Sequence, residues 1–340
     1  MVYIRTDANN LVATGHIMRC ITIAKKIKTF NEDVVFIVKD DDTVKMIGGK
    51  FKYYRLPSHE ITDIYNEIPF IREIVANDKN AKILLDLYIF DATYMSLIKS
   101  FSKVITFDDI FKEFFPVDMI INYNPHYYIY DYQTRYHNWA GKLLLGESYV
   151  PLREMFENAC SDENEKVKNI MIICGGGDAN HILYKIEKRI CEDELYQNYT
   201  FHIIAGFLNS DYDKLVEIAK DKRINIYRNV YDMAAILKKM DIVISAAGTV
   251  LFECCKMQVP TIFFCVADNQ KDVVKGFGAK DVMIYAGDIR DDEQQIINNI
   301  FENIEFLAHN YEIRKKMRKL MGNMIDGKGA ERIANAIVTL

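Results

Sequence analysis

Apolar residues along the chain follow two alternating patterns, which together predict an α/β protein. Short runs of β-branched and aromatic residues, such as MVYIR at 1–5 and VVFIV at 34–38, are typical of strands in a buried parallel sheet. Between these runs lie longer stretches in which apolar residues recur every three or four positions, as they do in amphipathic helices. Because helices separate the strands, we expect the strands to pair in parallel.

The first half of the chain predicts one such series. We expect strands at 1–5, 34–38, 51–56, 81–87, 103–107 and 118–124, and helices at 15–30, around Val44, at 61–77 and around Tyr94. After Gly146 the alternation stops, and the polar stretch CSDENEKVKN at 160–169 has the composition of a linker between domains.

A second series follows the linker. Strands are expected at 169–173, 200–206, 224–228, 241–245, 261–266 and 282–286, with helices after Asn180, at 212–220, 231–240, 249–257 and 269–277, and then two or three C-terminal helices. The chain is therefore predicted to form two Rossmann-like domains, at 1–155 and 165–325, with a helix at 326–340 that could return to the N-terminal domain. Two such domains would face each other across a cleft suited to a ligand.

Composition narrows the class of ligand. The length of 340 residues supports two domains, and a net charge of −5 gives no basic surface for nucleic acid. No apolar run is long enough for a signal peptide or a membrane span, so we expect a cytoplasmic protein without an integral membrane segment. The seven cysteines include no C-x-x-C pair, which argues against a disulfide framework or a zinc site.

The first segment with candidate chemistry links the first predicted strand to the first helix. It reads RTDANNLVATGHIMRC at 5–20 and contains Asp7, Thr14, Gly15 and His16. The carboxyl end of such a strand opens onto the ligand crevice of a parallel sheet. The helix dipole disfavours the protonated form of a histidine at a helix start, so His16 could act as a base. A histidine that only caps the helix is an equally good interpretation of position alone.

Two later segments could bind phosphate. In CGGGD at 174–178, Gly176 and Gly177 would let the backbone approach a ligand, although a tight structural turn explains the pattern more simply. In ISAAGTVLFE at 244–253, small residues lead from a strand into a helix. The residues of interest there are Ser245, Ala246, Gly248 and Thr249, followed one turn later by Glu253. Amides at the helix start suit a diphosphate, and the carboxylate of Glu253 suits a ribose diol. An N-capped surface helix is the alternative.

Polar residues also follow other predicted strands. The turn Asp268, Asn269, Gln270 could bind sugar hydroxyls or simply cap a helix. Asp86 and Tyr88 lie at the end of the strand at 81–87. These positions all belong to the edge at which ligands bind in such folds.

Asp108 and Asp109 form a pair of adjacent carboxylates after the strand at 103–107. Paired carboxylates can hold a metal or exchange protons, but we interpret these two as solvated loop residues. No histidine and acid cluster has the spacing of metal ligands, so neither a metal nor another cofactor is expected.

Together these segments resemble the UDP-sugar hydrolases of pseudaminic acid biosynthesis (PseG) and the related spore-coat polysaccharide protein SpsG. The resemblance rests on R-T-D-A and T-G-H-I-M-R-C within 5–20, D-L-Y at 86–88, F-D-D at 107–109, G-G-G-D-A-N at 175–180, I-S-A-A-G-T at 244–249 with Glu253, and D-N-Q at 268–270. It implies a GT-B fold whose C-terminal half is similar to the glycosyltransferase MurG. One departure is Leu87, where the family commonly has histidine.

The resemblance also implies roles for individual residues. His16 would be the catalytic residue, acting on water as a general base, and Arg19 in the same motif would contact substrate. The helix start at 245–249 and Glu253 would hold UDP, and the D-N-Q turn would contact the diphosphate or the sugar. The family cleaves the bond between the anomeric carbon and the diphosphate, inverting the centre without a metal.

The leading hypothesis is a hydrolase of a UDP-linked acetamido-deoxysugar, working in nonulosonic acid or surface polysaccharide biosynthesis. A glycosyltransferase with a UDP-sugar donor and a non-catalytic nucleotide-sugar binding protein are the alternatives. The tyrosine-rich segment at 123–136 could line the sugar pocket, cover the cleft or form a contact surface, but we interpret it as a loop packed by its own rings.

Overall fold

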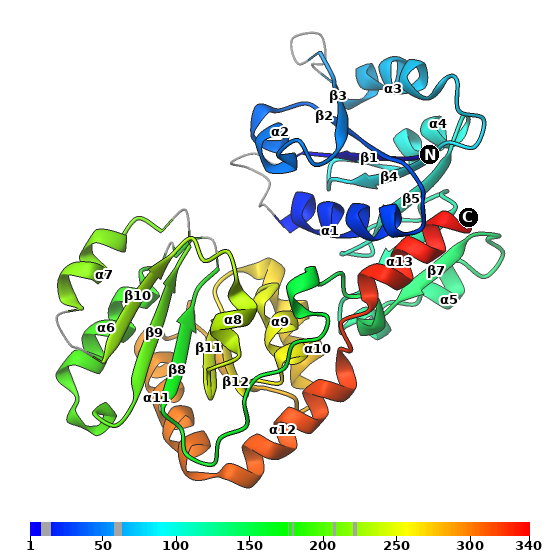
Figure 1. Ribbon diagram of the computed structural model, residues 1–340. Coiled ribbons are helices and arrows are strands. Elements are labelled where there is room, and N and C mark those ends of the chain that lie inside the picture. Colours follow the sequence, from blue (N-terminus) through cyan, green and yellow to red (C-terminus); the bar gives the residue numbers. More distant parts are fainter. Residues whose placement is uncertain (8–14, 58–62, 176, 179, 207–208, 220–222) are drawn as a thin grey trace. The chain divides into compact units, whose positions relative to one another are not determined.

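The computed structural model describes residues 1–7, 15–57, 63–175, 177–178, 180–206, 209–219 and 223–340, without the side chain of Asn269. These residues form two compact units, each built on its own sheet (Figure 1). Unit 1 comprises Met1–Glu154 and Gly327–Leu340, and unit 2 comprises Met155–Asp326.

Unit 1 contains a parallel sheet with the strand order β3-β2-β1-β4-β5-β6-β7. Its strands are β1 (Val2–Thr6), β2 (Val34–Val38), β3 (Lys52–Arg55), β4 (Lys82–Asp86), β5 (Lys103–Phe107), β6 (Met119–Asn122) and β7 (Lys142–Leu145). Its helices include α1 (Gly15–Thr29), α2 (Asp41–Ile47), α3 (Ile68–Val75), α4 (Ala92–Lys99), α5 (Tyr132–Arg135) and α13 (Gly329–Val338). The parallel pairing predicted from the sequence is confirmed in every ladder of this sheet.

Helices cover both faces of the unit 1 sheet, with α1 and α13 on one face and α3 and α4 on the other (Figure 1). The α1 face follows from its sequence, because Ile17, Cys20, Ala24 and Ile27 recur at helical spacing and all are fully buried. This packing fixes the first turn of α1 near the carboxyl end of the sheet. The helix therefore presents His16 at the edge where ligands bind in parallel sheets.

The C-terminal helix α13 belongs to unit 1 and packs against α1. Lys82 Nζ donates to the carbonyl of Val338 at 2.6 Å, and Arg332 Nη1 donates to the carbonyl of Ser148 at 2.8 Å. At the start of the helix, Gly329 leaves no room for a side chain, since a Cβ there would lie 2.2 Å from the carbonyl oxygen of Val150. The last residues of the chain thus help to hold the helix that carries His16.

Unit 2 contains a second parallel sheet, in the order β10-β9-β8-β11-β12-β13. Its strands are β8 (Asn169–Ile173), β9 (Thr200–Ala205), β10 (Ile224–Arg228), β11 (Ile242–Ala246), β12 (Thr261–Cys265) and β13 (Ile284–Asp288). Its helices are α6 (Ile182–Glu192), α7 (Tyr212–Ile218), α8 (Met233–Leu237), α9 (Val250–Met257), α10 (Lys271–Gly278), α11 (Glu293–His309) and α12 (Tyr311–Met324), as far as the chain is described.

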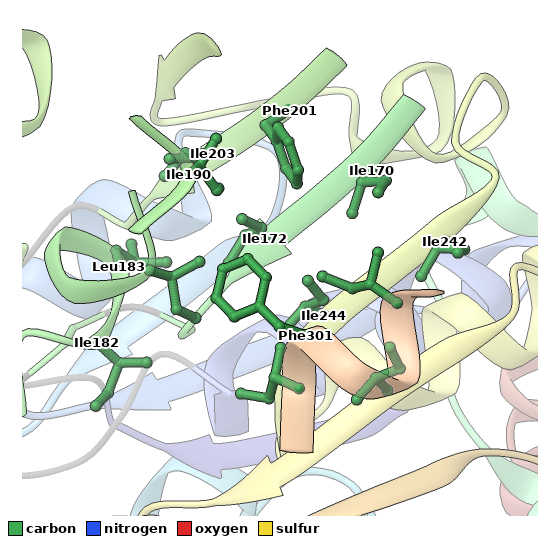
Figure 2. Packing of buried hydrophobic residues seen from close by; sticks show 14 of the residues in the cluster. Ile170, Ile172, Ile182, Leu183, Ile190, Phe201, Ile203, Ile242, Ile244 and Phe301 are labelled. Carbon is green, nitrogen blue, oxygen red and sulfur yellow. The ribbon is translucent and has the colours of Figure 1, made fainter. Parts of the chain in front are cut away.

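The core of unit 2 is mainly aliphatic, with isoleucine the most frequent residue, and also contains Tyr196, Tyr199, Phe201, Phe264 and Phe301. Figure 2 shows Ile170 and Ile172 of β8 beside Ile242 and Ile244 of β11, with Phe301 of α11 nearby. All five side chains are essentially inaccessible to solvent. Burying each such side chain stabilises the fold by about 1.5–3 kcal/mol, so this core holds the central strands and their carboxyl ends in fixed register.

The structure differs from the sequence prediction in a few elements. The strand β7, at one edge of the sheet, was not predicted. The helix predicted at 61–77 is divided among the described residues into a 3-10 turn, η1 (Ile64–Glu67), and α3. Pro69 lies in the first turn of α3, where it lacks an N–H to continue the preceding turn. Among the described residues, no helix combines the length and the apolar character needed to cross a membrane.

Candidate active site

Three neighbouring strands of unit 1 bring candidate residues to one edge of the sheet. β4 pairs with β1 on one side and β5 on the other, and all three run in the same direction. Asp7, Asp86 and Asp109 lie at or just after the carboxyl ends of these strands. His16 lies in the first turn of α1, so the sequence prediction correctly places it near the same edge.

His16 is hydrogen-bonded to the carboxylate of Asp86, with Nδ1 2.6 Å from Oδ1. A carboxylate can only accept, so Nδ1 carries a proton, and in the neutral imidazole Nε2 then has a free lone pair. The side chain of His16 is 9% exposed, and the ring of Tyr88 meets the imidazole edge to face at a centroid distance of 4.7 Å. The carboxylate thus fixes both the tautomer and the orientation of the ring, as a general base requires.

Arg19 holds Asp86 through two hydrogen bonds. Its Nε lies 2.7 Å from Oδ2 and its Nη2 lies 2.5 Å from Oδ1 of the carboxylate. Burial alone would raise the pKa of Asp86, but the charge and hydrogen bonds of Arg19, with the contact from His16, hold it well below its usual range. Asp86 therefore stays ionised and can stabilise a positive charge on His16.

The same guanidinium is bound by a second carboxylate, that of Asp109. Arg19 Nη2 lies 2.9 Å from Oδ2, and Arg19 Nη1 donates to Tyr123 Oη at 2.9 Å. The ring of Phe107 lies under the guanidinium, with 3.9 Å between Cζ and the ring centroid. Asp109, Tyr123 and Phe107 could not be assigned to this site from the sequence, because nothing in a single sequence pairs Arg19 with residues that lie 90, 104 and 88 positions away.

The interpretation of Asp108 and Asp109 as solvated loop residues is wrong. Asp108 is 1% exposed, and it accepts from Tyr132 Oη at 2.9 Å and from the Phe111 amide at 2.8 Å. Burial raises its pKa to about 6, although these hydrogen bonds lower it. The two carboxylates follow one strand but point to different partners, one to the aromatic segment and the other to Arg19.

Asp7 is held by its own buried network. Arg5 Nη1 lies 2.7 Å from one carboxylate oxygen, and the Lys39 amide lies 2.7 Å from the other. The carboxylate of Glu67 accepts from Arg5 Nη2 at 2.9 Å and from Arg5 Nε at 3.0 Å. It also accepts from Tyr94 Oη at 2.5 Å. Both oxygens of Asp7 thus join β1 to the residue after β2, and the network makes this end of the sheet rigid.

The remaining unit 1 candidates are Gly15, the first residue of α1, and Tyr88, whose side chain is 61% exposed. Thr14 lies outside the described residues. In the tyrosine-rich segment, Tyr132 and Tyr136 are buried and stack on each other at 6.1 Å, so the prediction of a loop packed by its own rings is confirmed for them. Tyr123 is the exception, since it reaches Arg19.

In unit 2, the turn from β11 into α9 has small residues and few side-chain contacts. Ser245 is buried and donates to the carbonyl of Ala246 at 2.8 Å, while Gly248 has open space where a Cβ would project. Thr249 is exposed and makes no side-chain capping hydrogen bond to α9. Glu253 is half-buried in the first turn of the same helix. This helix start can receive an anionic group without displacing a side-chain cap.

The glycine turn after β8 is arranged differently. Gly175 has a φ of +80°, a conformation that favours glycine, while Gly176 lies outside the described residues and Gly177 has an irregular backbone. The carboxylate of Asp178 accepts from the amides of Ile182 and Leu183 at 2.9 and 2.8 Å. A carboxylate thus already occupies these α6 amides, which favours the structural turn over a phosphate site.

The D-N-Q turn forms a 3-10 helix, η6 (Asp268–Gln270), after β12. Asp268 is exposed and pairs with Lys271 at 2.8 Å and Arg290 at 3.1 Å. Gln270 Oε1 accepts from the Val266 amide at 2.9 Å, so this side chain closes the turn. The side chain of Asn269 lies outside what is described.

No group of three or more histidine, cysteine or acidic side chains among the described residues could hold a metal ion. A cavity of about 890 Å³ lies in unit 1 beside Tyr3, Val35 and Lys52, at the amino ends of the strands. Because the candidate residues gather at the carboxyl ends, this cavity lies at the opposite edge of the sheet and has no part in the site described above.

Known sequences show which proteins this chain is related to. Residues 169–324 match the C-terminal domain of glycosyltransferase family 28. The chain is 22% identical, over 82% of its length and 96% of the relative's, to the UDP-2,4-diacetamido-2,4,6-trideoxy-beta-L-altropyranose hydrolase of Campylobacter jejuni. It is 24% identical, over 56% of its length, to the spore coat polysaccharide biosynthesis protein SpsG of Bacillus subtilis. The chain is a homologue of PseG and SpsG. It spans 57% of SpsG and 57% of an uncharacterized Methanocaldococcus jannaschii relative that is 24% identical.

Solved structures extend the comparison to the fold. MurG of Acinetobacter baumannii superposes with a TM-score of 0.69 at 10% identity, covering 100% of this chain and 99% of MurG. The UDP-GlcNAc 2-epimerase of Neisseria meningitidis, solved with UDP-GlcNAc bound, has a TM-score of 0.66 at 12% identity and covers 100% of both chains. The GT-B fold expected from the sequence is therefore confirmed, although a shared fold does not by itself specify a function.

Proposed function

We propose that this protein hydrolyses a UDP-linked acetamido-deoxysugar to the free sugar and UDP, with His16 as the general base. The observation that carries the proposal is the pair His16 and Asp86, joined at 2.6 Å. The hydrolase homologue from Campylobacter jejuni supports the substrate class. Nonulosonic acid or surface polysaccharide biosynthesis is the setting that the homologues suggest.

In the proposed reaction, Nε2 of His16 removes a proton from water as the water oxygen attacks the anomeric carbon. The bond between that carbon and the diphosphate oxygen breaks, and UDP leaves with the bonding electrons, which inverts the centre. His16 becomes positively charged, and the ionised Asp86 at Nδ1 stabilises that charge. In this scheme Arg19 acts through Asp86, because both Nε and Nη2 are bound to it.

Unit 2 would hold the UDP moiety. The start of α9 from Ser245 to Thr249 would bind the diphosphate through backbone amides, and Glu253 would accept hydrogen bonds from the ribose. The D-N-Q turn at 268–270 would contact the diphosphate or the sugar. Backbone amides can stabilise the charge of the leaving group, so the scheme requires no metal ion.

A GT-B glycosyltransferase is the second candidate, favoured by the family 28 domain match and the MurG-like fold. In that case His16 would deprotonate an acceptor hydroxyl instead of water. A catalytically silent UDP-sugar binding protein would keep the unit 2 features without using His16 as a base.

Release of UDP from a panel of UDP-sugars, measured with no acceptor present, tests the proposal. The hydrolase hypothesis predicts multiple turnovers with UDP and free sugar in equal amounts. Turnover only after an acceptor is added would support the transferase, and UDP-sugar binding without turnover under either condition would support the binding protein.

A further inference from the structure

The two carboxylates bound to Arg19 differ in how fully their oxygens are used. Asp86 accepts from Arg19, His16 and Cys20 at distances between 2.5 and 3.2 Å, and its side chain is 1% exposed. The carboxylate is therefore saturated and enclosed. Asp86 has no remaining capacity for a ligand.

Asp109 is satisfied much less completely. It accepts from Arg19 at 2.9 and 3.3 Å, but its contacts from Tyr88 Oη and Asn124 Nδ2 are both 3.4 Å long, near the limit of a hydrogen bond. Its side chain is 11% exposed. A better placed donor could replace either long contact without breaking the pair with Arg19.

The charges around Arg19 also favour a donor at this position. One guanidinium carries one positive charge, which Asp86 alone would neutralise. The addition of Asp109 leaves an excess negative charge in a nearly buried cluster, and such a charge is costly unless a polar partner compensates it. A hydroxyl or an amide N–H would serve as that partner, whereas a diphosphate would be repelled.

Asp109 lies close to the proposed base. Arg19 Nη2 is 2.9 Å from Asp109 Oδ2 and 3.2 Å from His16 Nδ1, so a single nitrogen separates the two side chains. Tyr88 lies against the His16 ring and also reaches Asp109. A group bound to Asp109 would therefore lie close to the His16 ring, at the edge of the sheet where the proposed reaction takes place.

We propose that Asp109 binds a hydroxyl or acetamido N–H of the sugar ring next to the reacting carbon and so contributes to the choice of sugar. The inference rests on the proposed function, because it assumes a UDP-sugar ligand. It assigns the sugar, rather than the diphosphate, to the edge of β4 and β5. Its competitor is a purely positioning role, in which Asp109 only holds Arg19 in place for Asp86.

Calorimetric titration with two ligands separates these roles. UDP is compared with UDP-N-acetylglucosamine and UDP-N-acetylgalactosamine, and the gain in affinity of the better sugar nucleotide over UDP measures sugar recognition. The variants are Asp109→Asn, which keeps the size of the side chain but removes its charge, and Tyr123→Phe. Tyr123→Phe loosens Arg19 by removing its 2.9 Å partner but leaves the Asp109 carboxylate in place.

We expect Asp109→Asn to reduce the sugar-dependent gain by about tenfold to a hundredfold, as for the loss of a hydrogen bond to a charged group, with UDP affinity unchanged. Tyr123→Phe should retain most of the gain. Equal losses in the two variants, an unchanged gain in Asp109→Asn, or no gain in the wild-type protein would each overturn the proposal for Asp109. Failure of the wild-type protein to bind UDP at all would overturn the proposed function as well.

Discussion

The carboxyl edges of the two sheets present different chemical groups. In unit 1, β1, β4 and β5 end in buried charged side chains that hold one another, with His16 and Arg19 both bound to Asp86. In unit 2, the corresponding turn from β11 into α9 consists of small residues, and Thr249 is exposed with no side-chain cap. One edge is organised by side-chain charges and the other by backbone amides.

This difference suggests that the two units have different roles in the proposed reaction. A side-chain network orients a base and holds it in one protonation state, so it suits a chemical step but binds little by itself. A bare helix start binds a polyanion through its dipole and its amides, and requires no titratable group. The comparison therefore predicts that changes in unit 1 alter turnover, while changes in unit 2 alter UDP affinity.

The largest effect is expected from His16→Asn. General-base assistance is worth about 10²–10⁴ in rate, so kcat should fall on that order while UDP affinity stays close to that of the wild-type protein. Steady-state kinetics at saturating substrate and UDP titration measure the two quantities. His137→Asn, at an exposed histidine of the same unit, is the matched control and should leave kcat unchanged. Near-normal turnover in His16→Asn would exclude this histidine as the base.

Glu253→Ala should show the opposite behaviour. Loss of a charged hydrogen-bond partner is worth about 1.5–3 kcal/mol, so UDP should bind about tenfold to a hundredfold more weakly. At saturating substrate kcat should change little, because the proposed base lies in unit 1. Calorimetry with UDP tests this, with Glu302→Ala on the exposed side of α11 as the control. If UDP binds Glu253→Ala as tightly as wild type, the ribose assignment is wrong.

The same contrast explains what the sequence could and could not predict. Strand ends and helix starts are local features, so periodicity correctly placed His16 and Asp86 near one edge of a parallel sheet. The unit 2 turn was also visible, since small residues between a strand and a helix form a continuous stretch of sequence.

The connections within the unit 1 edge could not be predicted. Arg19 is bound to Asp86 and Asp109, which lie 67 and 90 positions away, and such pairs depend on strand order and side-chain direction. Side-chain direction also explains why the prediction for Asp108 and Asp109 was wrong. The polar sequence suggested that both side chains are in solvent, but they point to different partners inside the protein, Tyr132 and Arg19.

A smaller effect, on the pH dependence of stability, is expected in the interior of unit 2. There, within the described part of the chain, a buried carboxyl has no ion pair of the kind that Asp86 and Asp109 form with Arg19 in unit 1. Glu187 of α6 is fully buried, and neither carboxylate oxygen has a hydrogen-bond partner among the residues that the structure describes. Burial raises its pKa to about 7 from an ordinary value of 4.5. The folded state therefore binds this proton more tightly than the unfolded state, and stability falls as the pH rises from about 4.5 through about 7.

Glu187→Gln should remove this loss of stability. Relative to the variant, the wild-type protein should lose about 1–3 kcal/mol of unfolding free energy between mildly acidic and mildly alkaline pH, the usual cost of an unsatisfied buried polar group. Urea denaturation across that pH range measures the difference. Glu192→Gln, at an exposed position on the same helix, is the control and should follow the wild-type curve. Parallel curves for wild type and Glu187→Gln would show that the pKa of this carboxyl is the same in the folded and unfolded states, and the prediction would be wrong.

The smallest expected effect is that of a metal chelator, which should leave kcat unchanged. The carboxyl edge of the unit 1 sheet is rich in carboxylates, so a divalent cation is the obvious alternative to Arg19 as the positive charge that binds them. However, the guanidinium already lies 2.5 Å from Asp86 and 2.9 Å from Asp109, and its positive charge would repel a cation placed between them. Turnover after incubation with chelator, and again after addition of magnesium or manganese, measures the dependence. A reversible loss restored by either metal would mean that Arg19 moves away during the reaction, and the carboxylates of unit 1 would then be metal ligands rather than supports for His16.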